Sequence, residues 1–177
     1  MIKFRTANFF DIENIMKLEE KCFNKYTQEK KEVYLERIEV FPDGFIILEL
    51  DDQFVGAVSS EIWQYVSVVN RDIFTLGHSI KKQIKLNGNE LYISSIGILP
   101  EYRSQGFGEA LFKELIKNIK LKFQNVVHGI LLLSEEWEYA RKIYMQNNFK
   151  ECKILEGFFM STDGTKKNGI VMRKNIL

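Results

Sequence analysis

Apolar residues follow two different periods in the middle of the chain. Residues 91–99 are almost continuously apolar, which is typical of a strand buried on both faces. Over residues 106–122 the apolar positions return at helical spacing, and residues 126–133 are again continuously apolar. A strand, a helix and a second strand in this order most simply form a right-handed unit with parallel strands. The inward-facing helix positions are expected to be Ala110, Leu111, Leu115, Ile116 and Ile119.

The remaining segments alternate between helices and short strands. Asn8 and Asp11 resemble a capping box at the start of one helix, and Thr27 and Ser134 are expected to cap two more. Residues 51–53 are a hairpin signal. Further strands are predicted over residues 2–5, 45–50, 54–63, 149–160 and 169–173. The pattern predicts one mixed α/β domain over residues 1–177, with a sheet of about seven strands and about four helices.

The connection between residues 64 and 90 is too long for a tight turn. Long connections in compact domains are often functional, and residues 79–86 have the pattern of a short helix. Five aromatic residues in and around this connection and in the last strands are expected to be core, dimer-interface or acceptor-site residues: Trp63, which ends the preceding strand, Tyr65, Phe74, Phe158 and Phe159.

Composition excludes several classes of protein. The 177 residues have a formal net charge of +1, which gives no global field for binding nucleic acid or an anionic membrane. The amino terminus lacks a signal-peptide pattern, and no apolar run approaches the length of a membrane span. The two cysteines, Cys22 and Cys152, have no metal-site spacing and fit a reducing compartment. We therefore expect a cytoplasmic protein without a metal.

Two glycines follow the strand over residues 91–99. The run from Arg103 to Gly108 reads Arg-Ser-Gln-Gly-Phe-Gly and leads into the amphipathic helix. Glycine allows a ligand to approach the backbone, and the first amides of a helix attract phosphate. A glycine-rich turn that only opens a helix is the structural alternative. No Gly-Lys-Ser/Thr follows, and the spacing is not G-x-G-x-x-G, so neither a Walker A loop nor a dinucleotide site is predicted.

This segment resembles motif A of the GNAT superfamily of acyl-CoA-dependent N-acyltransferases, and the order of elements is also similar over essentially the whole chain. The resemblance implies acetyl-CoA as donor, a pantetheine arm paired with Ile96, Gly97 and Ile98, and an amide near Ile98 that polarises the thioester carbonyl. It also implies that the fourth and fifth strands splay near Leu99 and Leu132. The pyrophosphate would lie on Arg103, Ser104, Gln105, Gly106, Phe107, Gly108 and Glu109.

The segment from Ala140 to Phe149 is similar to the GNAT pattern Ala-x-x-x-Tyr-x-x-x-Gly-Phe. The resemblance implies that Tyr144 is the general acid that protonates the departing thiolate; a half-buried packing residue is the alternative. Asn148 replaces the family's Gly, which is a mild change because Asn tolerates a left-handed backbone. Trp137 replaces an Asn that commonly contacts pantetheine.

The general base is not fixed by the sequence. Some ribosomal-protein acetyltransferases of the superfamily carry Glu where this chain has Leu132. Glu61, His78 and Glu90 are the candidate bases, each with a structural alternative, and a water relay is equally possible. We expect an N-acetyltransferase acting on a primary amine of a small molecule, protein or peptide; the alternative is a CoA-binding regulatory or interaction module. The sequence leaves the length of the acyl chain open, and the aromatic carboxyl-terminal strands favour a homodimer.

Overall fold

The computed structural model describes residues 1–176. Seven strands form one sheet in the order β1-β2-β3-β4-β5-β7-β6, and β4 and β5 are its parallel pair. The strands are β1 (Ile2–Thr6), β2 (Phe45–Leu50), β3 (Gln53–Trp63), β4 (Glu90–Ile98), β5 (His128–Ser134), β6 (Lys150–Met160) and β7 (Lys166–Asn175). The helices are α1 (Ile12–Cys22), α2 (Lys31–Val40), α3 (Ile80–Gln83), α4 (Phe107–Lys122) and α5 (Glu138–Gln146). The predicted mixed seven-stranded sheet is confirmed.

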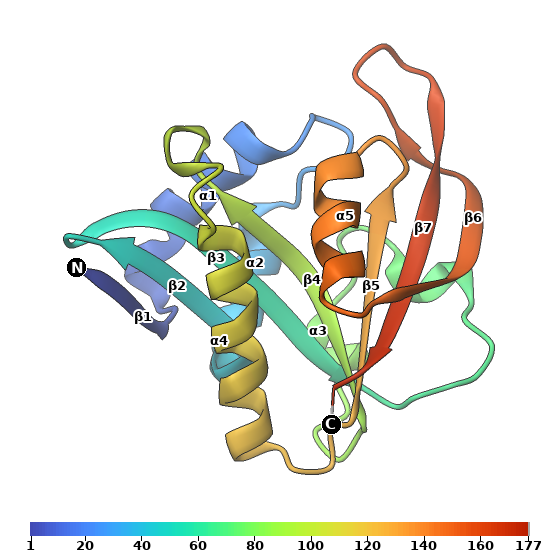
Figure 1. Ribbon diagram of the computed structural model, residues 1–177, viewed down its shortest axis with the longest axis horizontal. Coiled ribbons are helices and arrows are strands. Elements are labelled where there is room, and N and C mark those ends of the chain that lie inside the picture. The colour runs from blue at the N-terminus through green and yellow to red at the C-terminus, as the bar shows by residue number, and fades with distance from the viewer. Residues whose placement is uncertain (177) are drawn as a thin grey trace.

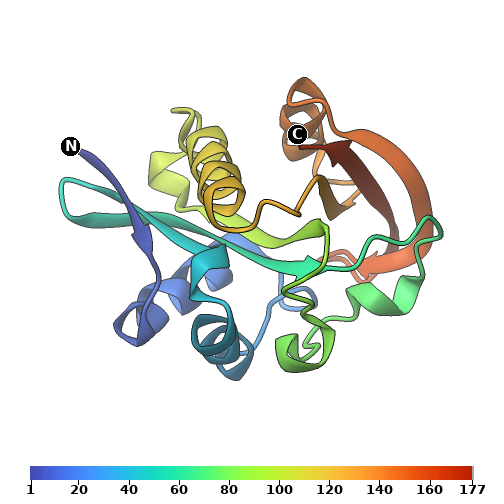
Figure 2. The ribbon, with the colours of Figure 1, turned by 90° about the horizontal axis from the view of Figure 1, so that it is seen from below.

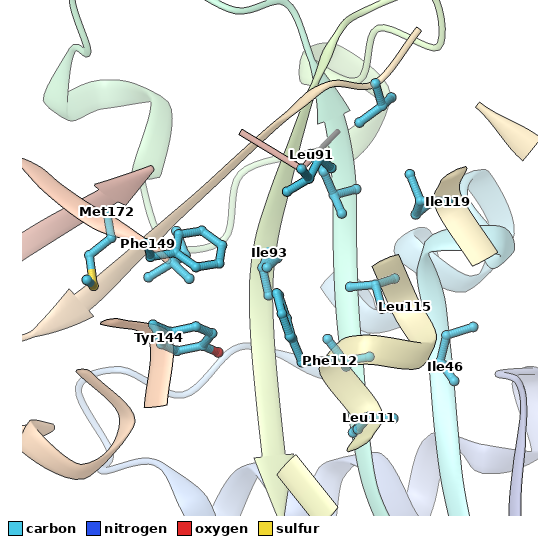
Figure 3. Close-up of a cluster of buried hydrophobic side chains, with 14 of the residues drawn as sticks. Ile46, Leu91, Ile93, Leu111, Phe112, Leu115, Ile119, Tyr144, Phe149 and Met172 are labelled. Carbon is cyan, nitrogen blue, oxygen red and sulfur yellow. The ribbon is translucent and has the colours of Figure 1, made fainter. Parts of the chain in front are cut away.

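Helices cover both faces of the sheet. Figure 2 shows α1, α2 and α3 on one face and α4 and α5 on the other. The apolar stripe of α4 packs on the sheet through Leu111, Leu115 and Ile119, none of which is exposed. Phe149 and Met172 extend this core towards β5 and β7, as Figure 3 shows. A charged outer face and an apolar inner face explain why α4 forms where its period predicts it.

Local signals at the turns are confirmed in two places. Asn8 and Asp11 form the capping box, although the first turn after Asn8 is a 3-10 helix that precedes α1. The β2–β3 hairpin turns through Asp51 and Asp52, both with positive φ, which matches the twist that a two-residue hairpin needs.

Two predicted caps are wrong. Thr27 lies before α2, which begins at Lys31, and its hydroxyl donates to the carbonyl of Asn24 instead. Ser134 is the last residue of β5, and α5 begins four residues later at Glu138. Both hydroxyls stabilise turns that precede the helices, because Ser and Thr bond the backbone equally well in turns and at caps.

No helix within residues 1–176 combines the length and apolar character needed to span a bilayer.

Candidate active site

The two parallel strands separate early and open a cavity. β4 pairs with β5 only from Glu90 to Tyr92, opposite His128 to Ile130, and the strands diverge beyond these residues (Figure 1). The separation therefore begins nearer the amino ends of both strands than the positions of Leu99 and Leu132 predict. A cavity of about 1170 Å³ occupies the fork. The backbone of β4 is unpaired there on the side that faces β5, so it can bond to an extended ligand.

The glycine-rich segment lies at the rim of this cavity. Ser104 and Gly106 have φ values of 63° and 80°, and the left-handed turn leads directly into α4. A Cβ on Gly106 would meet no atom within 4 Å, and one on Gly108 would meet only Ile98, at 3.8 Å. The open space and the first amides of α4 fit a pyrophosphate.

Arg103 braces this segment. Its Nε donates to the carbonyl of Ile98 over 3.0 Å, and its Nη2 lies 3.3 Å from the sulfur of Cys22. The guanidinium thus connects the end of β4 to the end of α1, while one face of Arg103 lines the cavity. Ile96, Gly97, Ile98, Ser104, Gly106, Phe107, Gly108 and Glu109 also line the cavity, whereas Gln105 does not.

Tyr144 projects from α5 into the core side of the fork. Figure 3 shows its hydroxyl directed towards Phe112 of α4 and Ile93 of β4. Its ring packs against Phe112 and Phe149, with centroids 6.0 and 5.5 Å away. Among the described residues no group hydrogen-bonds to this hydroxyl, and burial raises the pKa of the phenol above its ordinary value. The side chain therefore stays protonated and faces the cavity, as a proton donor requires.

The structure brings Glu61 and His78 together. Nε2 of His78 lies 2.7 Å from Oε1 of Glu61, and Nδ1 lies 3.0 Å from the carbonyl of Thr75. Burial, the largest single effect, lowers the pKa of His78, but the hydrogen bond and charge of Glu61 together with the hydrogen bond to Thr75 outweigh it, so the pKa is raised. Two acceptors around one ring favour a ring that carries both protons. Only His78 of the pair lines the cavity, because the fully buried Glu61 lies behind it beside Arg37 and Trp63.

Glu90 lies away from the cavity. It is buried, and its carboxylate forms an ion pair with Nε of Arg173 over 2.9 Å. Burial raises the pKa of this carboxyl group, while Arg173 opposes that rise. The pair joins β4 to β7 at the end where β4 and β5 are still paired. Glu90 therefore has a structural role.

The sequence analysis missed several polar residues that line the cavity. Glu19 is almost fully buried and accepts hydrogen bonds from the hydroxyl of Tyr34, at 2.6 Å, and the amide of Glu29, at 2.7 Å. Burial raises the pKa of Glu19. Tyr92 lines the cavity as well, and its ring stacks on Trp63. Glu19 lies four residues after Ile15 and seven after Ile12, on the apolar face of α1, so helical spacing is the signal that could have shown it to be buried.

The two departures from the family pattern have different consequences. Asn148 adopts the left-handed conformation, with φ of 66°, as its position after α5 predicts. Trp137 lines the cavity and contacts Phe23 and Phe159 instead of offering a polar side chain. Phe158 and Phe159 line the same cavity, so they lend no support to the homodimer, which stays a prediction. Within residues 1–176, no cluster of three or more His, Cys, Asp or Glu side chains could hold a metal ion.

Comparisons with known proteins identify the family and the fold. The model of the acetyltransferase (GNAT) family matches residues 12–149. An N-alpha-acetyltransferase of Sulfurisphaera tokodaii is 24% identical over 161 residues, covering 89% of this chain and 85% of the relative. A [ribosomal protein bS18]-alanine N-acetyltransferase of Haemophilus influenzae is 32% identical over 84 residues, covering 48% of this chain and 56% of that protein. The loading GNATL domain of CurA from Lyngbya majuscula has a similar fold, with a TM-score of 0.82, 19% identity and coverage of 99% of this chain and 98% of the domain.

Proposed function

The chain belongs to the acetyltransferase (GNAT) family, and we propose that it transfers the acetyl group of acetyl-CoA to the α-amino group of a protein or peptide. One observation carries the donor half: the strand fork connects the open glycine turn at Gly106 to the buried hydroxyl of Tyr144 through a single cavity. The acceptor half is supported by relatives named as N-alpha- and ribosomal-protein alanine acetyltransferases.

Different residues of the fork would bind different parts of the donor. Gly106, Gly108 and the first amides of α4 would hold the pyrophosphate, and Arg103 would keep the end of β4 in place. The unpaired backbone of Ile96 and Ile98 would bond to the pantetheine arm, and an amide near Ile98 would stabilise charge on the carbonyl oxygen. Acetyl-CoA, once bound, supplies the activated acetyl group.

Tyr144 would give its proton to the sulfur that leaves. A phenol titrates near 10 and an alkyl thiol near 8.5, so a buried phenol gives up its proton only to a thiolate held close by. Burial keeps the hydroxyl protonated until that moment.

The acceptor amine must also lose a proton before it attacks. His78 and Glu61 stay predictions for this step. A His78 ring that carries both protons must first give one to Glu61 or to solvent before its free nitrogen can accept the proton of the amine. Glu19 is a third candidate, because it lines the cavity and its raised pKa brings it closer to neutral pH. A water relay into the Glu19–Tyr34 pair would serve the same purpose.

The deciding experiment follows thiol release from acetyl-CoA in the presence of a peptide with a free amino terminus and an internal lysine. We expect thiol release that matches acetylation of the α-amine, located by fragment mass spectrometry. The control is the same peptide with its amino terminus already blocked, which should not react. Acetylation of lysine alone would contradict the acceptor. Tight CoA binding without transfer to any amine would instead favour a CoA-binding module, the alternative that Trp137 and Leu132 allow.

A further inference from the structure

Three aromatic side chains close the open end of the strand fork. Phe23 follows α1, Trp137 precedes α5, and Phe159 lies near the end of β6. The ring of Trp137 lies 5.9 Å from that of Phe23 and 5.2 Å from that of Phe159. All three rings line the cavity and are half-buried. We call these three residues the aromatic wall.

The wall is held in place by polar contacts behind it. Nδ2 of Asn24 donates to the carbonyl of Met160 over 3.1 Å and connects the chain after α1 to the end of β6. Phe158 packs beside Phe159, with centroids 5.0 Å apart, and the guanidinium of Arg71 lies over its ring. Arg71 also donates to the carbonyl of Glu156 over 2.7 Å. The rings therefore form a preformed apolar surface inside a cavity, which is the usual character of a ligand subsite.

The charges around the cavity favour a peptide over a free amino acid as the acceptor substrate. Among the described residues that line it, the arginines Arg71 and Arg103 already donate to backbone carbonyls, and His78 is paired with Glu61. Lys142 lies on α5 together with Tyr144, and therefore on the side of the cavity proposed to bind the acetyl donor. The carboxylates that line the cavity are Glu19, Glu29, Asp72, Glu109, Glu136 and Glu138. Glu29, Glu109 and Glu136 form ion pairs with Arg37, Lys113 and Lys167. Within residues 1–176, Glu19, Asp72 and Glu138 form no ion pair, so a free α-carboxylate near these three would be repelled, whereas the neutral amide of a peptide would not.

Resting on the proposed function, we propose that the aromatic wall binds the side chain of the acceptor's first residue, so that substrates begin with a large apolar residue. This side chain is attached to the carbon beside the attacking nitrogen. It must therefore lie beside the thioester, which the proposed donor geometry places near Ile98. The wall lies close to this point, because Cys22, directly before Phe23, has its sulfur 3.4 Å from the carbonyl of Ile98. Burial of apolar surface contributes about 25 cal/mol per Å² to binding. A peptide that begins with Met, Leu or Phe therefore binds more tightly than one that begins with Gly, Ala or Ser, which leaves the three rings exposed to water.

The test uses peptides that differ only in their first residue: Met, Leu, Phe, Ala, Ser or Gly. We expect kcat/KM to be about tenfold or more higher for the first three, the scale on which a hydrophobic pocket discriminates. Phe159→Ala should raise KM for the Met peptide and remove most of this preference, with a small effect on the Ala peptide. Phe10→Ala is the matched control, because Phe10 is 96% exposed and lies outside the cavity lining.

The outcomes separate this inference from the proposed function. Equal kcat/KM for all six peptides, or a preference that Phe159→Ala leaves intact, overturns the inference while the α-amine acetyltransferase stands. A preference for butyryl-CoA over acetyl-CoA that Phe159→Ala abolishes assigns the wall to the donor's acyl chain and also overturns it. No acetylation of any peptide overturns the proposed function itself. Calorimetry with CoA shows whether each variant still folds and binds the donor.

Discussion

Burial sets the protonation state of Tyr144, because a phenolate would lose its hydration against Phe112 and Phe149. We predict that Tyr144→Phe lowers kcat by about 100-fold or more, the range of general acid catalysis, and leaves CoA affinity unchanged. Since the pKa of the phenol is raised, Tyr144 should produce no loss of kcat below pH 10. Steady-state rates over a pH range, together with calorimetry, provide the measurement.

Tyr65→Phe is the control for this change, because Tyr65 is partly exposed and does not line the cavity. Full turnover by Tyr144→Phe would show that Tyr144 is a packing residue, which its contacts in the core also permit.

Gly106 permits a sharper comparison, because the chain contains a second glycine in the same backbone state. Gly106 and Gly164 have φ of 80° and 82°, and a Cβ on either meets nothing within 4 Å. We predict that Gly106→Val and Gly164→Val both lose stability through backbone strain of about 1–2 kcal/mol or more. Only Gly106→Val should weaken CoA binding, by about tenfold or more, because its side chain would project into the turn at the cavity rim. Equal CoA affinity by calorimetry in both variants would rule out a phosphate site at this turn.

At the scale of elements, Glu61 and His78 connect β3 to the long segment between β3 and β4. The pKa of His78 is raised in the folded state, so its stabilising effect is complete below the unfolded value, near 6.5, and declines as pH rises through the folded value. We predict that His78→Asn reduces the free energy of unfolding by roughly 1.5–3 kcal/mol at pH 6, the range for a charged hydrogen bond, and by less at pH 9. Urea unfolding at the two values measures this difference.

Glu61→Gln serves as the partner variant, because it keeps the size of the side chain and removes the charge. In this background the effect of His78→Asn should lose most of its pH dependence. A stability difference that grows with rising pH would mean that His78 is buried as the neutral ring.

The elements that could be predicted from sequence are those whose signal is local. The apolar period of α4, the hairpin at Asp51 and the glycine turn at Gly106 each depend on a few neighbouring residues. Thr27 and Ser134 mislead because a hydroxyl that stabilises a turn has the same sequence pattern as one that caps a helix. The helical spacing of α1 could have placed Glu19 on the buried face, but its partner Tyr34 comes from the next helix and had no local signal. The pairing of Glu61 with His78 could not be predicted either, because the segment after β3 folds back to bring the two side chains together.

At the scale of the whole molecule, the fork divides the sheet into two parts, and in the described residues their backbones pair only over the short β4–β5 ladder. A ligand that contacts both sides of the fork should therefore stabilise the entire domain. At 100 times its dissociation constant, CoA would add about 2.7 kcal/mol. For a domain of this size that corresponds to a rise in Tm of roughly 5–11 °C. Thermal unfolding with and without CoA measures the rise.

The pyrophosphate should supply much of this stabilisation, because α4 presents its first amides at the turn containing Gly106. Pantetheine at the same concentration should therefore raise Tm by much less than CoA. Gly106→Val should reduce the rise given by CoA and leave the smaller rise given by pantetheine unchanged. An equal rise with both ligands would mean that the backbone of β4 alone holds the donor, and that the glycine turn only opens the helix.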